Sequence, residues 1–379
     1  MDERALAERL ITYDTSNIDG LRAAAGFVKG WLEAREIDVE DHDFNGLPVL
    51  TAEMGPRDAP TIVLHGHLDV VPGHPEQFKP RVEGDRLIGR GAYDMKGGLA
   101  GMMCALRDLR DQSDVRVHFV CVSDEESDEP WDYRGSDYVV EKGYVGDFAI
   151  TGEPTDLRIG VQSKGVLALH VDVSGKAAHG STPWEGDNAV LKAVDVFRSI
   201  QAMPFAREAS ELFDRPSISL GRILGGDRIN KVPDHCAIDV DIRYLPGQDP
   251  DAILNDIRAL PDVGVEVVFA RDPAIVARDE PHVRALAETV ARWTPEDRIS
   301  IGRDGASDAN SFLDAGVPAV EFGPVGGGHH GPEEWVSISS LARYRMALGA
   351  FVERLPGHLS RDGAQPPAEP TTSRLPDPA

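Results

Sequence analysis

Apolar residues along the first half of the chain follow two spacings in turn. In some segments they recur every three or four residues, which predicts helices with one buried face. Others are short apolar runs rich in β-branched residues, which predict buried strands. Strands that alternate with helices indicate a mostly parallel sheet with helices on both faces. The predicted helices are residues 3–13, 20–35, 95–111 and 134–143, and the predicted strands are 47–54, 60–65, 115–123 and 147–151.

The order of the predicted elements changes near residue 165. A strand and a helix are followed by two strands, a second helix and a final strand. This β-α-β-β-α-β order is ferredoxin-like, and it interrupts the α/β pattern. The elements are strand 166–174, helix 187–202, strands 216–224 and 234–245, helix 249–260 and strand 263–270.

The α/β pattern resumes after Pro273, with helices at 281–293, 307–315 and 338–354 and a strand at 317–322. The segment from Pro356 to Ala379 is rich in proline and has little apolar periodicity, which predicts disorder. We therefore expect three parts. They are a discontinuous catalytic α/β domain (1–164 and 274–355), an inserted α+β lid domain (165–273) and a disordered tail (356–379).

The chain is strongly acidic, with 64 Asp and Glu against 39 Lys and Arg and a net charge of −25 over 379 residues. Such a charge repels phosphate groups, so we expect neither nucleic acid nor an anionic membrane surface as a partner. The acidity is spread along the chain and lysine is scarce, which favours a halophilic protein from a high-salt cytoplasm, where charges are screened. An ordinary acidic bacterial protein is the alternative.

The sequence also bears on cellular location and redox state. It contains no apolar run of about 18 residues, so no membrane-spanning helix is expected. Its first residues lack the basic and apolar regions of a signal peptide, so we expect a cytoplasmic protein. The cysteines Cys104, Cys121 and Cys236 are far apart and form no CxxC pair. We expect them to be buried, reduced thiols without a chemical role.

The strongest local signal is His65-Gly66-His67-Leu68-Asp69, which ends a predicted buried strand. Because side chains alternate along a strand, His65, His67 and Asp69 face the same way at its carboxyl end. Open α/β sheets place their ligands at that edge. An imidazole beside a carboxylate suits a metal ion. A polar solvated turn is the simpler alternative.

Four further polar clusters follow predicted strands or open predicted helices. Each has a simpler explanation as a helix cap or a solvated loop. Together they supply histidines and carboxylates at one edge of one sheet, and this mixture of nitrogen and oxygen donors fits a site for two divalent metal ions, most naturally Zn²⁺. The clusters are Gly89–Gly98 with Asp94, Ser123–Ser127 with Glu125 and Glu126, Thr151–Thr155 with Glu153, and Gly326–Glu334 with His329 and His330.

These five motifs occur in the order found in a family of metal-dependent deacylases and exopeptidases. The family includes acetylornithine deacetylase, succinyl-diaminopimelate desuccinylase, aminoacylase and bacterial glutamate carboxypeptidase, and the chain resembles it as far as about residue 355. The resemblance implies a zinc-aminopeptidase-like α/β fold with a ferredoxin-like lid through which two copies form a homodimer.

The resemblance also implies roles at the metal site. Asp94 would bridge two metal ions, and Asp69 would orient His67. Glu125 would be the general base that takes a proton from a water between the metals. His330 fits the family spacing better than His329, because an acidic residue and a Glu follow it at the expected positions. The implied metal ligands are His67 and Glu153 for one ion, Glu126 and His330 for the other, and Asp94 for both.

Further resemblances concern substrate binding. His179, in the lid segment Gly175–Ser181, would reach the partner subunit's active site and help to stabilise the oxyanion. Asn230 and Arg243 match lid positions, and an arginine can bind a substrate carboxylate through two hydrogen bonds. A surface ion pair is the alternative for Arg243. Ser307 corresponds loosely to a substrate-facing loop.

The leading hypothesis is a dinuclear-metal amidohydrolase that removes the acyl group from an N-acyl amino acid or a related small-molecule amide. The nearest alternative is a dipeptidase or carboxypeptidase with the same site, and a catalytically silent dimeric binding protein is a third reading. Co²⁺ or Mn²⁺ could replace Zn²⁺ at such a site. The stretch 127–135 is longer and more acidic than in the family, so the identities of the acyl group and the amine stay open.

Overall fold

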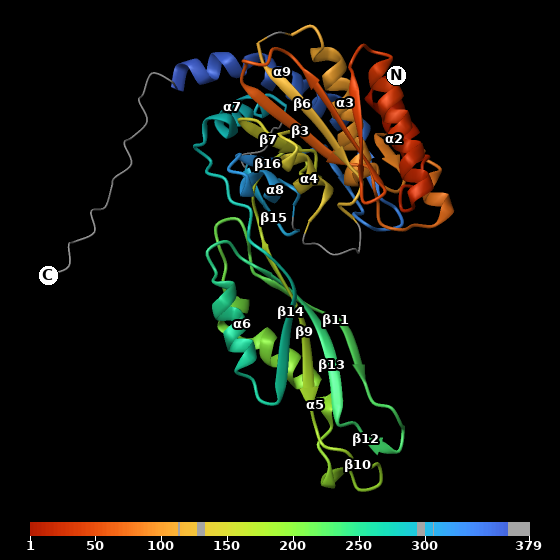
Figure 1. Cartoon of the computed structure of the whole chain (residues 1–379), viewed down its shortest axis with the longest axis vertical. Helices are drawn as coiled ribbons and strands as arrows, with labels where there is room; N and C mark the ends of the chain where they lie inside the picture. Colours follow the sequence, from red (N-terminus) through yellow and green to blue (C-terminus); the bar gives the residue numbers. More distant parts are fainter. Residues whose placement is uncertain (113, 127–132, 294–299, 306, 363–379) are drawn as a thin grey trace, which may run out of the picture.

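A computed structural model describes residues 1–112, 114–126, 133–293, 300–305 and 307–362. It contains a large sheet covered by helices and a smaller, elongated unit that projects away from it (Figure 1). Most of the acidic stretch 127–135, namely 127–132, lies outside the described residues, as does the part of the expected disordered tail from 363 onward. In the described part of the chain, every helix falls short of the length or the apolar character that a membrane span needs.

The large sheet has eight strands in the order β1-β2-β6-β3-β7-β16-β8-β15. Its four central strands, β6, β3, β7 and β16, run parallel to one another, which confirms the predicted α/β class. The strands are β1 (Val39–Phe44), β2 (Leu47–Met54), β3 (Thr61–His67), β6 (Arg116–Val122), β7 (Phe148–Thr151), β8 (Ile159–Ser163), β15 (Ser300–Arg303) and β16 (Ala319–Phe322).

Helices cover both faces of this sheet because its central strands are apolar on both sides. In β3, for example, Ile62, Val63 and Leu64 are all fully buried. One face carries the largest apolar core, formed with α1 (Glu3–Ile11), α2 (Ile18–Glu33), α3 (Gly97–Leu109), α7 (Pro281–Val290) and α9 (Ile338–Asp362). The other face packs against α4 (Gly135–Glu141) and α8 (Ala309–Asp314).

The elongated unit is built on an antiparallel sheet in the order β11-β13-β9-β14. Burial alternates along β13, because one face packs against two helices and the other faces solvent. This is the arrangement expected for the lid. Its elements are β9 (Gly165–Ser174), α5 (Ala189–Ala202), β11 (Ser217–Gly225), β13 (His235–Tyr244), α6 (Pro250–Arg258) and β14 (Val263–Arg271), with β10 (Ala178–His179) and β12 (Lys231–Val232) at its tip.

The remaining elements are short. A small sheet joins β4 (Arg81–Glu83), β5 (Arg86–Ile88), β17 (Gly326–Gly327) and β18 (Trp335–Ser337) in the order β17-β18-β5-β4. It ties the segment before Asp94 to the segment that carries His329 and His330. Short 3₁₀ helices occur at Pro75–Phe78, Pro183–Glu185 and Pro204–Arg207, and a short π-helical turn occurs at Ala92–Lys96.

One boundary in the sequence analysis was wrong. Helix α9 continues through Pro356 to Asp362, so residues 356–362 are helical rather than part of a disordered tail. The apolar spacing explains the difference, because Leu355 is fully buried and Leu359, one turn later, still packs against the main core. That packing outweighs the hydrogen bond that a proline removes from a helix.

Candidate metal centre

The candidate residues converge because they follow the carboxyl ends of four neighbouring parallel strands. His67 ends β3, and Glu125 and Glu126 come shortly after β6. Glu153 follows β7, and the loop with His329 and His330 follows β16. Parallel strands end at the same edge of a sheet, so these loops meet there.

The first cluster consists of His67, Asp94 and Glu153, whose ligand atoms all lie within 4.8 Å of one another. Nε2 of His67 lies 3.1 Å from Oδ1 of Asp94 and 3.7 Å from Oε1 of Glu153. The opposite nitrogen, Nδ1, lies 3.1 Å from the backbone oxygen of Asp69 and 3.5 Å from its Oδ1. Asp69 therefore contacts the side of the ring that points away from the carboxylates, as a residue that orients a metal ligand would.

The second cluster consists of Asp94, His329 and His330. Nε2 of His330 lies 2.8 Å from Oε1 of Glu126 and 3.4 Å from Oδ2 of Asp94. Nε2 of His329 forms a hydrogen bond to the same Oδ2. Asp94 therefore belongs to both clusters, and both histidines reach it, although the sequence analysis preferred His330.

The electrostatics of the site indicate that it is built to hold positive charge. Burial, and then the charge of Asp94, raise the pKa of Glu153 well above its usual range. Burial would also raise the pKa of Asp94, but hydrogen bonds from the histidines of both clusters hold it well below its usual range. Among the described residues, no hydrogen-bond donor reaches the buried Oε1 of Glu153. Buried carboxylates are unfavourable without a counter-charge, so divalent cations with nitrogen and oxygen ligands fit both clusters.

The two adjacent histidines can be separated by experiment. We expect His330→Ala to lower the metal content from about two ions to about one per chain, because it removes a contact to both Asp94 and Glu126. His329→Ala should leave the content at about two, because among the described residues Asp94 is the only proposed metal ligand to which His329 forms a hydrogen bond or ion pair. Metal analysis of the dialysed variants measures this, and the reverse pattern would assign the ligand to His329.

A buried carboxylate that the sequence analysis did not single out holds the Asp94 loop in place. Oε1 of Glu334 accepts hydrogen bonds from the backbone N–H groups of Tyr93 and Asp94, at 2.9 and 3.0 Å. Its Oε2 accepts from the Gly91 N–H at 3.0 Å and from Nη1 of Arg90 at 2.9 Å. In the sequence, Glu334 could have been recognised by its place as the last residue of the His330–Glu334 motif. Glu334 therefore joins the histidine loop to the Asp94 loop.

Glu125 and Glu126 lie on the turn after β6. The backbone N–H of Glu126 donates to Oδ2 of Asp69 at 2.6 Å, so Asp69 contacts both this turn and His67. Burial is the main reason that the pKa of Glu125 lies well above its usual range. The charge of His67 lowers this pKa, but the charges of nearby carboxylates raise it further. A carboxyl group with a raised pKa in a cleft is typical of an acid–base residue.

A cavity of about 540 Å³ opens onto both clusters. Of the residues predicted to bind substrate, Arg243 lines it, and its guanidinium also pairs with Asp241 at 2.8 Å. Arg158 lines the same cavity and was not predicted. The full set of candidate metal-site residues in its lining is Asp94, Glu125, Glu126, Glu153, His329 and His330.

The other predicted substrate-binding residues lie elsewhere in this chain. His179 and Asn230 come together at the tip of the lid, where the Gly180 N–H donates to the Asn230 carbonyl at 2.8 Å. This tip is the end of the lid farthest from the large sheet (Figure 1). Ser307 is buried, and its Oγ accepts the Ala309 N–H at 3.1 Å at the start of α8. It lies just before Asp308, the N-cap residue of α8, and outside the lining of the cavity.

Comparison with known proteins is consistent with this geometry. A family model described as Peptidase family M20/M25/M40 matches residues 63–354. The chain is 29% identical over 360 residues to a succinyl-diaminopimelate desuccinylase of Gluconacetobacter diazotrophicus, covering 88% of this chain and 92% of that protein. It is 26% identical over 374 residues to a probable succinyl-diaminopimelate desuccinylase of Staphylococcus epidermidis, covering 85% and 90%.

Solved structures share the fold. A tripeptidase from Staphylococcus aureus has a TM-score of 0.76 at 21% identity, over 93% of this chain and 97% of that one. An M20 family metallo-carboxypeptidase from Sulfolobus solfataricus has a TM-score of 0.74 at 19% identity, over 94% and 100%. The resemblance inferred from the five motifs is thereby confirmed. Because the family model covers more than half of the chain, this protein belongs to Peptidase family M20/M25/M40 and is a metal-dependent hydrolase.

Proposed function

We propose that this protein is a dinuclear-metal deacylase that cleaves the amide bond of an N-acyl amino acid or a related N-acyl amine. The observation that carries the proposal is that two clusters of metal-ligand type share Asp94 and open onto one cavity beside Glu125. Of the relatives named above, one is named a succinyl-diaminopimelate desuccinylase and the other a probable one, which favours an acyl-amide substrate over a peptide. Peptidase activity at the same site is the alternative.

The residues present define the roles that we propose. His67, Asp94 and Glu153 would hold one metal ion, and Asp94, Glu126 and His330 would hold the other, with zinc as the expected metal. When bound, such ions polarise the scissile carbonyl and lower the pKa of a water molecule. The Glu125 carboxylate takes a proton from the attacking water and passes it to the amine nitrogen as the C–N bond breaks. Arg243, in the same cavity, binds a carboxylate of the substrate.

A substrate panel tests the proposed reaction. Amine release is measured at high salt with Zn²⁺ or Co²⁺ added, from N-acetyl and N-succinyl amino acids, N-succinyl-diaminopimelate and several dipeptides. We expect turnover of one acyl amide, abolished by removal of the metal with a chelator and restored when metal is added back. Cleavage of dipeptides alone would move the assignment to a peptidase. No turnover with metal bound would support a silent binding protein.

We also propose that the lid forms a homodimer through β11, an edge strand of its sheet. Exposed apolar side chains gather on this strand and on neighbouring α5, with Leu191 64% exposed and Leu224 55% exposed. Single exposed apolar residues are common, but several together on an unpaired strand edge indicate an interface. Such a dimer would let His179 and Asn230 of one lid act at the active site of the other subunit.

The homodimer is tested by light scattering. We expect wild-type protein to have twice the mass of one chain and Leu224→Asp to be monomeric, because a charge would be buried in the interface. The monomeric Leu224→Asp protein should also be less active than the wild type. Val268→Asp is the matched control, since Val268 is 62% exposed on β14 at the opposite edge of the same sheet. Wild-type protein of single-chain mass would contradict the proposal.

A further inference from the structure

Met95 directly follows Asp94, the residue common to both clusters, yet it does not line the cavity at the metal centre. Its side chain is fully buried instead. The end of this side chain is packed among three glycines from separate parts of the chain, which are Gly66, Gly98 and Gly152. The residue next to a proposed metal ligand is thus enclosed by backbone from three segments.

Met95 occupies the space that a side chain at position 66 would need. A Cβ atom built on Gly66 would lie only 2.6 Å from Cε and 3.3 Å from Sδ of Met95. Among the described residues other than its chain neighbours, the next nearest atom is Cδ1 of Leu99, at 3.6 Å. Carbon atoms in ordinary contact are about 3.5–4.0 Å apart. Met95 is therefore the residue that requires a glycine just before His67 on β3.

The same methyl group lies against the loop that follows β7. A Cβ atom built on Gly152 would be 2.6 Å from Cε of Met95, and one built on Gly98 would be 2.4 Å from the backbone oxygen of Gly152. The Gly152 N–H donates to the carbonyl oxygen of His65 at 3.0 Å, which joins the ends of β3 and β7. Glu153 is the next residue, so the Met95 methyl group lies beside the backbone that carries this proposed ligand.

We propose that Met95 is a positioning residue of the metal centre. Its Cε methyl group lies against the backbone before His67 and the backbone before Glu153, and it thereby sets the spacing of these two ligands. Its own main chain continues from Asp94, the third member of the first cluster. The proposal rests on the metal ligands proposed above, and it is independent of which substrate is cleaved.

Small displacements at this point matter because metal binding depends closely on the positions of the ligands. Ligand distances at a metal site hold within about 0.2 Å. Protein interiors are close-packed, so the loss or gain of one methyl group shifts or loosens its neighbours. Methionine suits this position because its unbranched side chain reaches between the two glycines. A leucine has a similar volume but places no atom where Cε lies.

A double-mutant cycle tests the contact between Met95 and Gly66. Met95→Ala removes the methyl group, and Gly66→Ala adds a Cβ atom that collides with it. Each change alone should raise the zinc concentration that half-saturates the metal-free protein by about tenfold. In the double variant the added Cβ enters the space that Met95 has left. It should therefore bind zinc at least about fivefold more tightly than the product of the two single effects predicts. Titration with buffered zinc measures this.

The matched control is Met103→Ala, which makes the same deletion at a fully buried methionine of the main apolar core. It should destabilise the metal-free protein as Met95→Ala does, but leave zinc affinity unchanged. Bound Co²⁺ supplies a second readout, because its visible absorption depends on coordination geometry. The spectrum should change in Met95→Ala and Gly66→Ala, return toward that of the wild type in the double variant, and stay unchanged in Met103→Ala.

Met95→Leu keeps the proposal testable if the alanine variants do not fold. It should stay folded, because it nearly conserves volume, and weaken zinc binding by about fivefold.

The outcomes distinguish this proposal from the proposed function. Additive losses of zinc affinity, an unchanged Co²⁺ spectrum in both single variants, or wild-type affinity in Met95→Leu would overturn the role of Met95, even if the wild-type enzyme hydrolyses acyl amides. The predicted pattern without turnover of any amide by wild-type protein would support the role of Met95 and refute the deacylase function. A wild-type protein that binds no zinc would refute the metal centre and, with it, this role.

Discussion

Glu125→Gln is expected to lower kcat for amide hydrolysis by about 10³-fold, the size of effect typical for loss of a general base. Glutamine has nearly the same shape, but its amide cannot accept the proton of the attacking water. Glu125 lines the cavity at the metal centre, and we place it outside the set of metal ligands. The metal content should therefore stay the same while activity is lost. Steady-state kinetics and metal analysis of the same samples test this.

The control for this variant is Glu33→Gln, an exposed glutamate at the end of α2. It should behave like the wild type in both measurements. A Glu125→Gln protein that keeps its kcat would show that another group moves the proton. A variant that loses its metal would instead make Glu125 a ligand, and the roles of Glu125 and Glu126 would have to be assigned again.

Glu334→Gln is expected to destabilise the folded protein by about 3–5 kcal/mol, as for a broken buried ion pair, and to weaken metal binding. The amide nitrogen of glutamine would face backbone N–H groups that now donate to Glu334. Arg90, which is 4% exposed, would lose its carboxylate partner. The loop that carries Asp94 would then be held less firmly. Urea denaturation of metal-free protein and zinc titration measure the two effects separately.

The neighbouring residue provides a matched control. Glu333 is 68% exposed and pairs with Arg81 at the surface, so Glu333→Gln should change stability by less than about 1 kcal/mol. If the Glu334→Gln and Glu333→Gln proteins had the same stability and zinc affinity, Glu334 would not position the Asp94 loop.

Much of the fold was accessible from local patterns. The apolar run from Thr61 to Leu64 predicted a buried strand, and the structure places it at the centre of the large sheet as β3. Strands β8 and β15 were missed because Ile159–Ser163 and Ser300–Arg303 are short and mix glycine and polar residues with apolar ones. Such segments become strands because a neighbouring strand pairs with them, which local sequence does not report.

The residue types needed for the site could be identified from the amino-acid sequence. Histidines and carboxylates after successive strands indicated a metal centre, because parallel strands end at one edge of a sheet. The order of the motifs further indicated the family. That resemblance, rather than spacing alone, implied that His67, Asp94 and Glu153 act together, and their ligand atoms lie within 4.8 Å of one another in the structure.

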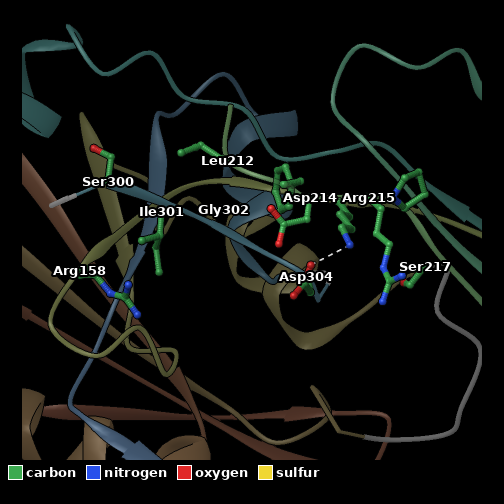
Figure 2. Close-up of a pocket in the computed structure, with 12 residues that line it drawn as sticks. Arg158, Leu212, Asp214, Arg215, Ser217, Ser300, Ile301, Gly302 and Asp304 are labelled. Carbon is green, nitrogen blue, oxygen red and sulfur yellow. Dashed lines mark ion pairs between the residues drawn. The ribbon is translucent and has the colours of Figure 1, made fainter. Parts of the chain in front are cut away.

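Which distant segments meet, and how their side chains are directed, is evident only in the folded protein. Asp94 and His329, separated by 235 positions, share a hydrogen bond, and Glu334 accepts four hydrogen bonds from the loop that carries Asp94. A cavity of about 620 Å³ likewise forms between the segment that leads into β11 and strand β15 (Figure 2). Contacts of this kind arise from the packing of loops far apart in the chain, and no periodicity within a single segment encodes them.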